Sequence, residues 1–348
     1  MKTRTLIPFV VVLFAAFSLS SNVHAQPLVN IETVTVGDPG NAADITGYGA
    51  VADVFAIGKY EVTISQYTTF LNSVASVTSD SYIVDLWNAN MMNDSPSIAG
   101  ISRSGAGTIA NPYVYAEVGP FGLTPPGASS AGNRPISYVS WFDAARFANW
   151  VNNGATNGAS TETGAYTLNG ATSGLGFSRN AGATWWIPSE DEWYKAAYYK
   201  GGGTNAGYWV YPTQSDTAPG NVIGGATNQA NYNNGVYSVT QSGTPEPQNY
   251  LTDVGAFSNS ASAYDTYDQG GNVFEWNDAV LGDSARGFRG GSWYTDDFNL
   301  QSSGPAGSDP LLEFSFVGFR LTTVPEPSTY ALLAMSAAGA LWLAKRRR

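Results

Sequence analysis

The sequence predicts a single, loop-rich α+β domain of irregular secondary-structure content. Three observations lead to this prediction. Three helices can be located from their capping residues, and the remaining apolar or aromatic runs are short and separated by Gly, Asn, Pro and Ser. Charged residues make up only 12% of the 348-residue chain, whereas Trp, Tyr and Gly are plentiful. Such a composition fits neither a helical bundle nor a disordered acidic chain.

Each predicted helix begins with a hydroxyl residue that is followed three positions later by an acceptor side chain. These pairs are Thr63 and Gln66, Ser140 and Asp143, and Ser189 and Glu192. The pattern is a capping box, and apolar residues follow each box at helical spacing. The third helix is expected to stop at the glycine run 201–203. Between the helices we expect short strands and long loops.

The N-terminal segment has the features of a secretory signal peptide. Lys2 and Arg4 precede an apolar run over 6–19, and small residues around Ala25 match the spacing that signal peptidase recognises. The alternative is a membrane anchor, but the run is shorter than the roughly 20 residues needed to cross a bilayer. We therefore expect cleavage after Ala25.

The C-terminal segment has three parts in a fixed order. A Pro-Glu-Pro motif precedes an apolar stretch over 330–344, and the chain ends in basic residues. The defining positions are Pro325, Glu326, Pro327, Arg346, Arg347 and Arg348. This arrangement resembles the PEP-CTERM sorting signal.

That resemblance implies a short transmembrane helix that holds an exported protein transiently in the inner membrane of a Gram-negative bacterium. An exosortase then cuts near the motif and releases or re-anchors the protein outside. The alternative is an ordinary tail anchor with one short helix. Both interpretations place the main domain outside the cytoplasm, at the cell surface or beyond it.

The predicted segments are therefore 1–25, 26–323 and 324–348. Six of the 16 basic and one of the 27 acidic side chains lie in the two terminal segments, which leaves 10 basic against 26 acidic, a net charge of −16. Such a domain repels nucleic acid and anionic membranes. No Pro/Ser linker or charge block divides the middle segment, so we expect one domain.

The residue inventory excludes several kinds of chemistry. The chain has no cysteine, and its one histidine, His24, lies in the predicted signal peptide. Thiol nucleophiles, thiolate metal sites and redox dithiols are therefore impossible. A Ser-His-Asp triad and histidine-ligated zinc or iron are excluded as well.

Six motifs occur in an order that resembles the sulfatase-modifying factor, or formylglycine-generating enzyme, family. They are Gly58–Thr63, Arg134–Ala144, Trp186–Trp193, Gly271–Trp276, Arg289–Trp293 and Gly318–Leu321. The resemblance implies an elaborated C-type-lectin-like fold. In purely structural terms, the tryptophans of these motifs are core residues, and Arg289 and Arg320 are buried arginines held by carboxylates or carbonyls.

In that family, two cysteines shortly after the Gly-Gly-Ser-aromatic motif bind copper and carry out the oxidation. Thr295 and Leu300 stand at these two positions. Copper(I) needs soft sulfur ligands, which neither residue supplies. The resemblance therefore implies a pseudoenzyme, and copper is not expected.

The family also binds calcium, a cation that prefers oxygen ligands. The resemblance places one calcium site on Asp268, the carbonyls of Gly271 and Val273, and the carboxylate of Glu275. A second, poorly matched site would begin at Asn231 and Tyr232. The alternative is that Glu275 caps a loop or pairs with an arginine such as Arg289.

Three functions remain open. The first is a non-catalytic domain that binds or displays a ligand, either extracellular polysaccharide or a surface protein. Tyr208, Trp209 and Tyr211 could stack on sugars or could equally be core residues. The second is an enzyme of altered, cysteine-free chemistry, which would use the adjacent carboxylates of Asp296 and Asp297. The third is a structural component of the extracellular matrix.

Overall fold

The computed structural model describes residues 26–77, 86–93, 98, 100–118, 131–246, 248–304 and 306–325. The predicted signal peptide lies outside these residues, as do Glu326, Pro327 and the apolar and basic parts of the sorting tail. Within the described ranges, no helix is both long and apolar enough to cross a membrane.

The three predicted helices are confirmed. They are α1 (Ile64–Val74), α4 (Trp141–Asn152) and α5 (Glu190–Tyr198), and each begins with the predicted capping box, in which side chain and backbone satisfy each other. Helix α5 ends before the glycine run, because Tyr199 turns to an extended conformation and forms a bridge with Tyr208. The sequence did not predict two short helices, α3 (Asn90–Asn93) and the 3₁₀ helix η1 (Asp297–Leu300).

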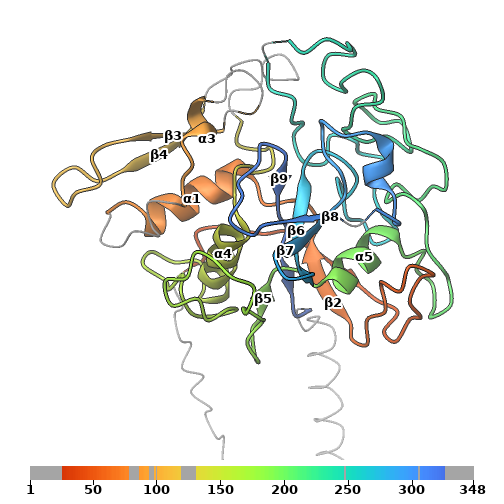
Figure 1. The fold of residues 1–348 in the computed structure, drawn as a ribbon, viewed down its shortest axis with the longest axis horizontal. Helices are drawn as coiled ribbons and strands as arrows, with labels where there is room; N and C mark the ends of the chain where they lie inside the picture. The colour runs from red at the N-terminus through yellow and green to blue at the C-terminus, as the bar shows by residue number, and fades with distance from the viewer. Residues whose placement is uncertain are drawn as a thin grey trace, which may run out of the picture.

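Two four-stranded sheets lie at the centre of the molecule (Figure 1). In strand order, the first contains β1 (Thr33–Val36), β2 (Phe55–Gly58), β10 (Thr322–Thr323) and β5 (Trp185–Trp186). The second contains β8 (Ala306–Ser308), β7 (Ala285–Arg289), β6 (Phe274–Leu281) and β9 (Val317–Gly318), with β9 parallel to β6. The last strand, β10, thus lies between β2 and β5, which come from distant parts of the sequence.

A two-stranded hairpin projects from the body of the molecule beside α1 (Figure 1). It is formed by β3 (Ile101–Ser104) and β4 (Val114–Glu117). Ile109, in the loop that joins the two strands, is 90% exposed. The hairpin therefore supplies an exposed site far from the core.

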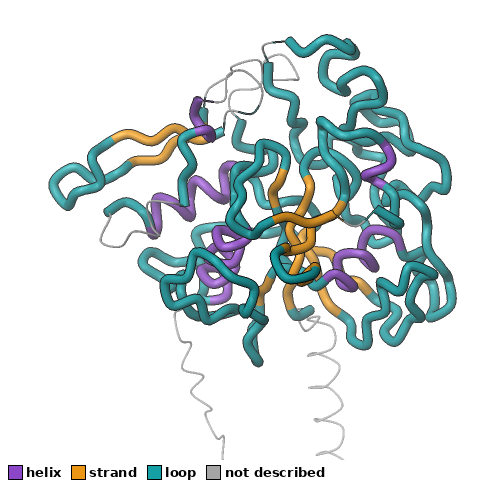
Figure 2. The backbone as a smooth tube through the Cα atoms, in the orientation of Figure 1, coloured by secondary structure: helices purple, strands orange, loops and turns teal. Residues whose placement is uncertain are grey.

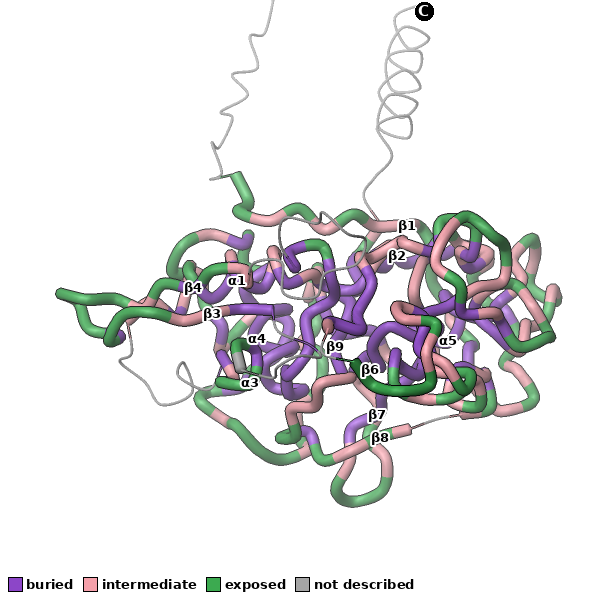
Figure 3. Tube along the Cα trace, turned by 90° about the horizontal axis from the view of Figure 1, so that it is seen from above, coloured by how far each residue is buried: buried purple, intermediate pink, exposed green. Residues whose placement is uncertain are grey.

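The core is rich in large aromatic side chains, in keeping with the low fraction of charged residues in the sequence. Helix α4 is buried over nearly its whole length (Figure 3). The tryptophans predicted to be core residues are buried: Trp141, Trp193, Trp276 and Trp293. The indole N–H of Trp141 donates to the Asn277 carbonyl at 3.2 Å and that of Trp276 to the Val139 carbonyl at 2.9 Å. The indole N–H groups of Trp141 and Trp276 are thus satisfied.

Between α5 and β6 the described chain forms turns, loops and isolated bridges (Figure 2). These loops are fixed by bonds between distant residues. In one of them, the Asn272 amide donates to the Asn231 carbonyl at 2.8 Å. The loop that follows β7 packs against this region and carries the family's cysteine positions.

Candidate ligand-binding site

The loop that follows β7 leaves the sheet through two glycines in the left-handed region. Gly290 has φ 102° and Gly291 has φ 73°, and a Cβ at Gly290 would lie 2.7 Å from the Gln269 carbonyl oxygen. Only glycine fits this conformation and this close approach. Beyond the glycines, Trp293 stacks on Tyr250 with 5.1 Å between ring centroids. The loop therefore starts from a rigid base.

Thr295 and Leu300, which the resemblance assigns to the family's cysteine positions, have structural contacts here. Thr295 closes a tight turn, because its hydroxyl accepts from the Ser292 amide at 2.9 Å and its amide donates to the Ser292 carbonyl at 3.1 Å. Leu300 is fully buried and packs in a small cluster with Tyr211, Ala230 and Tyr232. Thr295 thus stabilises a turn, and Leu300 is a core residue.

Next to Thr295 lies an open hollow of about 510 Å³, which we call the bowl. It is lined by Asn233, Gly235, Tyr237, Tyr294, Thr295, Asp296 and Asn299. Tyr294 is 57% exposed, and nearby Phe298 is 61% exposed. Among the exposed large hydrophobic residues of the described chain, these two are the aromatic ones. Exposed aromatic rings beside a hollow are typical of ligand-binding sites.

The bowl also carries polar groups of several kinds. The Asn299 amide group donates to Oδ1 of Asp296 at 2.8 Å, and the Asn233 side-chain oxygen accepts from the Gly235 amide at 2.9 Å. Burial raises the pKa of Tyr237, so its hydroxyl stays a neutral donor. The bowl therefore offers amide, carboxylate and hydroxyl groups within one concave surface.

The indole N–H of Trp293 is buried and has no hydrogen-bond partner among the described residues. A buried donor without a partner costs about 1–3 kcal/mol. The ring of Trp293 packs edge-on against that of Tyr294, with 5.5 Å between centroids, and lies 6.0 Å from that of Tyr237. Two tyrosines that line the bowl thus pack against a buried ring that does not line it.

The carboxylates of Asp296 and Asp297 have separate partners. Asp296 is exposed and accepts from Asn299, whereas Oδ2 of Asp297 accepts from the Tyr211 hydroxyl at 3.0 Å. An acid–base pair needs both groups within reach of one reacting atom. The structure does not bring these two carboxylates together in a closed pocket.

The aromatic residues predicted to stack on sugars lie elsewhere and are mostly packed. The Tyr208 hydroxyl donates to the carbonyls of Ala42 at 2.8 Å and Gly49 at 2.9 Å, and Tyr211 is buried. Their role as core residues is the correct interpretation for these two. Sequence reasoning missed Tyr294 and Phe298, although both flank Thr295 in the loop where the family has its cysteines.

Glu275, the predicted calcium ligand, is fully buried and already bound by an arginine. Its carboxylate accepts from Nε of Arg320 at 2.5 Å, from Nη2 of Arg320 at 2.6 Å and from the indole N–H of Trp193 at 2.7 Å. The partner is Arg320 rather than Arg289, which pairs with Glu190. In this arrangement Glu275 does not fit the role of a calcium ligand, because the guanidinium fills its place.

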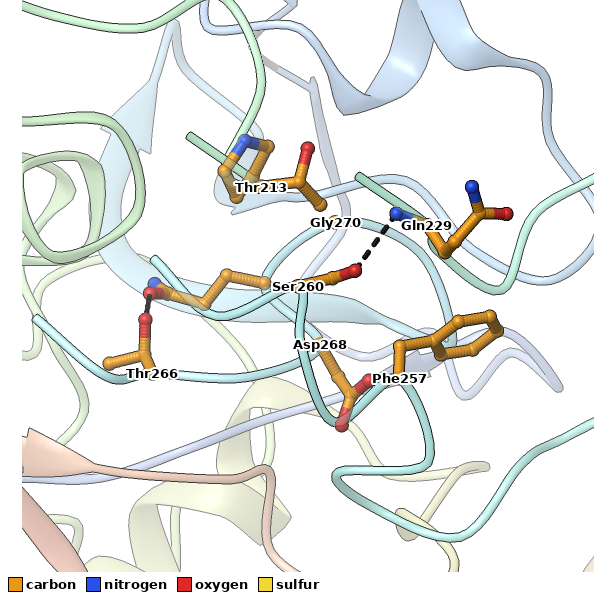
Figure 4. Close-up of a pocket in the computed structure, with 9 residues that line it drawn as sticks. Thr213, Gln229, Phe257, Ser260, Thr266, Asp268 and Gly270 are labelled. Atoms are coloured by element: carbon orange, nitrogen blue, oxygen red, sulfur yellow. Dashed lines mark hydrogen bonds between the residues drawn. The ribbon is translucent and has the colours of Figure 1, made fainter. Parts of the chain in front are cut away.

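Asp268 has a hydrogen-bond partner outside that ion pair. Its Oδ2 accepts from the Gly255 amide at 2.6 Å, and burial raises the pKa of this carboxyl to about 6. Asp268 and Phe257 both line an enclosed hollow of about 10 Å³, which has room for about one water molecule (Figure 4). Gly271, by contrast, packs against Asn231, since a Cβ there would lie 2.3 Å from the Asn231 carbonyl oxygen.

Asn231 and Tyr232, predicted to begin a second calcium site, are also buried. The Asn231 side-chain amide donates to the Tyr250 carbonyl and to Oδ1 of Asn272, both at 3.0 Å, and the Tyr232 hydroxyl donates to the Pro219 carbonyl. No group of three or more His, Cys, Asp or Glu side chains is placed to hold a metal ion in the described ranges. Calcium binding stays a prediction from the sequence.

Comparisons with solved structures find chains of similar length. CarF is 19% identical, with a TM-score of 0.49, and the match covers 85% of this chain and 99% of CarF. Treponema denticola variable protein 1 is 18% identical, with a TM-score of 0.49 and coverage of 85% and 96%. PvdO from Pseudomonas aeruginosa is 15% identical, with a TM-score of 0.41 and coverage of 85% and 92%. No curated protein matches the sequence significantly.

Family comparison gives a clear result for both parts of the chain. Residues 40–324 match the sulfatase-modifying factor enzyme 1-like domain, and residues 323–348 match the PEP-CTERM protein-sorting motif. The sorting motif indicates export, sorting to the cell surface and processing by an exosortase. Without cysteine, the domain cannot carry out the cysteine-dependent chemistry of its family. The chain therefore belongs to the sulfatase-modifying factor enzyme 1-like domain family, with the loop-rich α+β formylglycine-generating-enzyme-like fold.

Proposed function

We propose that this exported domain is a non-catalytic module that binds a ligand in the bowl. The observation that supports this proposal most is that Tyr294, 57% exposed, lies with Thr295 and Asp296 in a concave surface. The bowl's volume of about 510 Å³ lies within the range of small-molecule sites, roughly 300–1,000 Å³. The absence of cysteine from the chain and the presence of an exposed aromatic ring in the bowl favour binding over oxidation.

Glycan is the ligand class that this surface fits best. Tyr294 offers a ring face on which the apolar faces of sugars can stack, and Asn233, Asp296 and Asn299 offer amide and carboxylate groups for hydroxyls. The domain's net charge of −16 disfavours acidic polysaccharides. A neutral extracellular polysaccharide is therefore the expected ligand, with a surface protein as the alternative.

The test is a printed glycan array probed with purified residues 26–324. We expect binding to neutral glycans that is lost in Tyr294→Ala and kept in Ile109→Ala, the control at the exposed tip of the hairpin. Binding that Tyr294→Ala leaves intact would refute the role of the bowl. Self-association of the purified domain without glycan binding would instead favour the matrix-component alternative.

Calcium ordering of the loops is a separate proposal that rests on the family resemblance. Because Glu275 is held by Arg320, calcium near this site would have to bind chiefly through Asp268. The proposal predicts that millimolar calcium raises the melting temperature relative to chelator and that Asp268→Asn abolishes the rise. An identical melting temperature in calcium and in chelator would refute it.

A further inference from the structure

The sorting motif begins directly beside a central strand of the fold. Strand β10 lies between β2 and β5, with Thr322 opposite Ile57 on one side and Trp186 on the other. The Thr323 hydroxyl donates to the Thr184 carbonyl at 2.7 Å, and the Val324 amide donates to the same carbonyl at 3.2 Å. The chain is therefore held in the fold up to Val324, one residue before the motif.

The distance from this point to the membrane is short. The apolar stretch begins at Tyr330, only six residues after Val324. A fully extended chain spans at most about 3.3–3.6 Å per residue, so this connection reaches no more than about 22 Å. A folded domain of even 100 residues is wider than that, since its radius of gyration alone is about 13 Å. An enzyme that cuts the motif therefore has to touch the domain.

We propose that the face around Val324 and Pro325 is a docking surface for the membrane-embedded peptidase that cuts the tail. This inference rests on the export and tail processing indicated by the sorting motif and is independent of the bowl. The peptidase reads the motif together with the folded domain.

Two hollows flank Pro325 and give this surface its shape. One, of about 780 Å³, is bordered by segments 50–55 and 179–183 and by Val324. The other, of about 470 Å³, is bordered by the first residues after the predicted cleavage site, including Pro27, and by Thr323 to Pro325. Both ends of the described chain thus leave from one face (Figure 3). Val324 and Pro325 border both hollows.

The chemistry of the hollows indicates what the peptidase presents to them. The smaller hollow combines apolar side chains, such as Ile31 and Trp185, with polar ones, such as Asn30 and Asn152. The larger one carries three acidic residues and one basic residue: Asp53, Asp191, Glu192 and Arg179. Arg179 already pairs with Glu192 at 3.2 Å, so the rest of the rim is acidic. The complementary surface on the peptidase therefore combines apolar and hydrogen-bonding groups with basic groups at its edge.

The experiment follows loss of the tail from the full-length chain by pulse–chase in a host that processes such tails. One variant carries a flexible Gly-Ser linker of about six residues between Val324 and Pro325. A second carries Asp53→Lys in the rim of the larger hollow, and Ile109→Lys on the hairpin is the control. We expect the linker and Asp53→Lys each to slow cleavage roughly tenfold, with the control unchanged.

Melting temperatures equal to that of the wild-type domain exclude misfolding as the cause of slower cleavage. Faster or unchanged cleavage with the linker would overturn the proposal, because the face would then only hinder the enzyme or play no part. A wild-type tail that is never cut would overturn the processing itself and leave the bowl's function untouched. Slower tail cleavage in both variants, with normal cleavage in the wild type, would support docking.

Discussion

Glu275, whose carboxylate the family resemblance assigned to a calcium site, forms a buried ion pair with Arg320. Both side chains are fully buried, and Arg320 also donates to the Gly58 carbonyl at 2.9 Å and the Tyr267 carbonyl at 2.8 Å. Removal of one partner from a buried pair leaves an uncompensated charge. Through Arg320, the pair therefore links β6 to the end of β2 and to the loop that contains Tyr267.

Glu275→Gln is expected to lower the free energy of unfolding by about 3–5 kcal/mol, with the same loss in calcium and in chelator. Chemical denaturation measures this loss. Glu32→Gln, which breaks the exposed pair with Lys59, is the control and should cost less than about 1 kcal/mol. A loss that occurs only in calcium would contradict the pairing and restore Glu275 as a metal ligand.

Asp278 makes stability depend on pH. Burial raises the pKa of this carboxyl to about 7, although Arg286 lies 3.0 Å away and opposes the shift. A carboxyl whose pKa is higher in the folded than in the unfolded state binds more protons when folded. Its contribution is therefore fully present below its unfolded pKa and is lost as the pH rises toward about 7.

The free energy of unfolding should accordingly fall between about pH 5 and pH 8, and Asp278→Asn should flatten this slope. Denaturant melts at the two pH values measure it. Asp268 contributes in the same direction, since burial raises its pKa to about 6. A domain that gains stability between the two pH values would show that Asp278 is ionised and well paired throughout.

At the scale of single elements, the helix starts are the part of the fold that the sequence specifies most clearly. At α1, the Thr63 hydroxyl accepts from the Gln66 amide at 3.3 Å, and Oε1 of Gln66 accepts from the Thr63 amide at 2.9 Å. Such bonds join residues three positions apart, so local sequence predicts them. The end of α5 depends instead on the bridge between Tyr199 and Tyr208, which local sequence does not reveal.

Thr63→Ala should cost about 0.5–2 kcal/mol of stability, because the Gln66 amide at the start of α1 loses its acceptor. Thr63→Ser keeps the hydroxyl and should retain most of the stability, which makes it the matched control. Denaturant unfolding of both variants gives the comparison. Equal losses in the two variants would mean that packing of the Thr63 methyl group, and not the cap, is what matters.

For the whole molecule, the order of motifs predicted the family and its fold, because these residues form the buried scaffold. The site was less predictable. The family resemblance assigned Thr295 to a cysteine position, but the bowl beside it forms because loops from 231–237 and 292–300 meet in space. Likewise, nothing near Glu275 in sequence shows that Arg320 would reach it. The sequence does not reveal which distant loops are in contact, and the site depends on these contacts.

The central claim is that the bowl binds a glycan. Calorimetric titration of the domain with a neutral glycan identified on the array tests this claim most directly. The wild-type domain and Ile109→Ala should bind with the same affinity. Tyr294→Ala should bind about 5- to 30-fold more weakly, since a stacked aromatic ring contributes on the order of 1–2 kcal/mol. Equal affinity in wild type and Tyr294→Ala would contradict the claim and place the ligand on another surface of this domain.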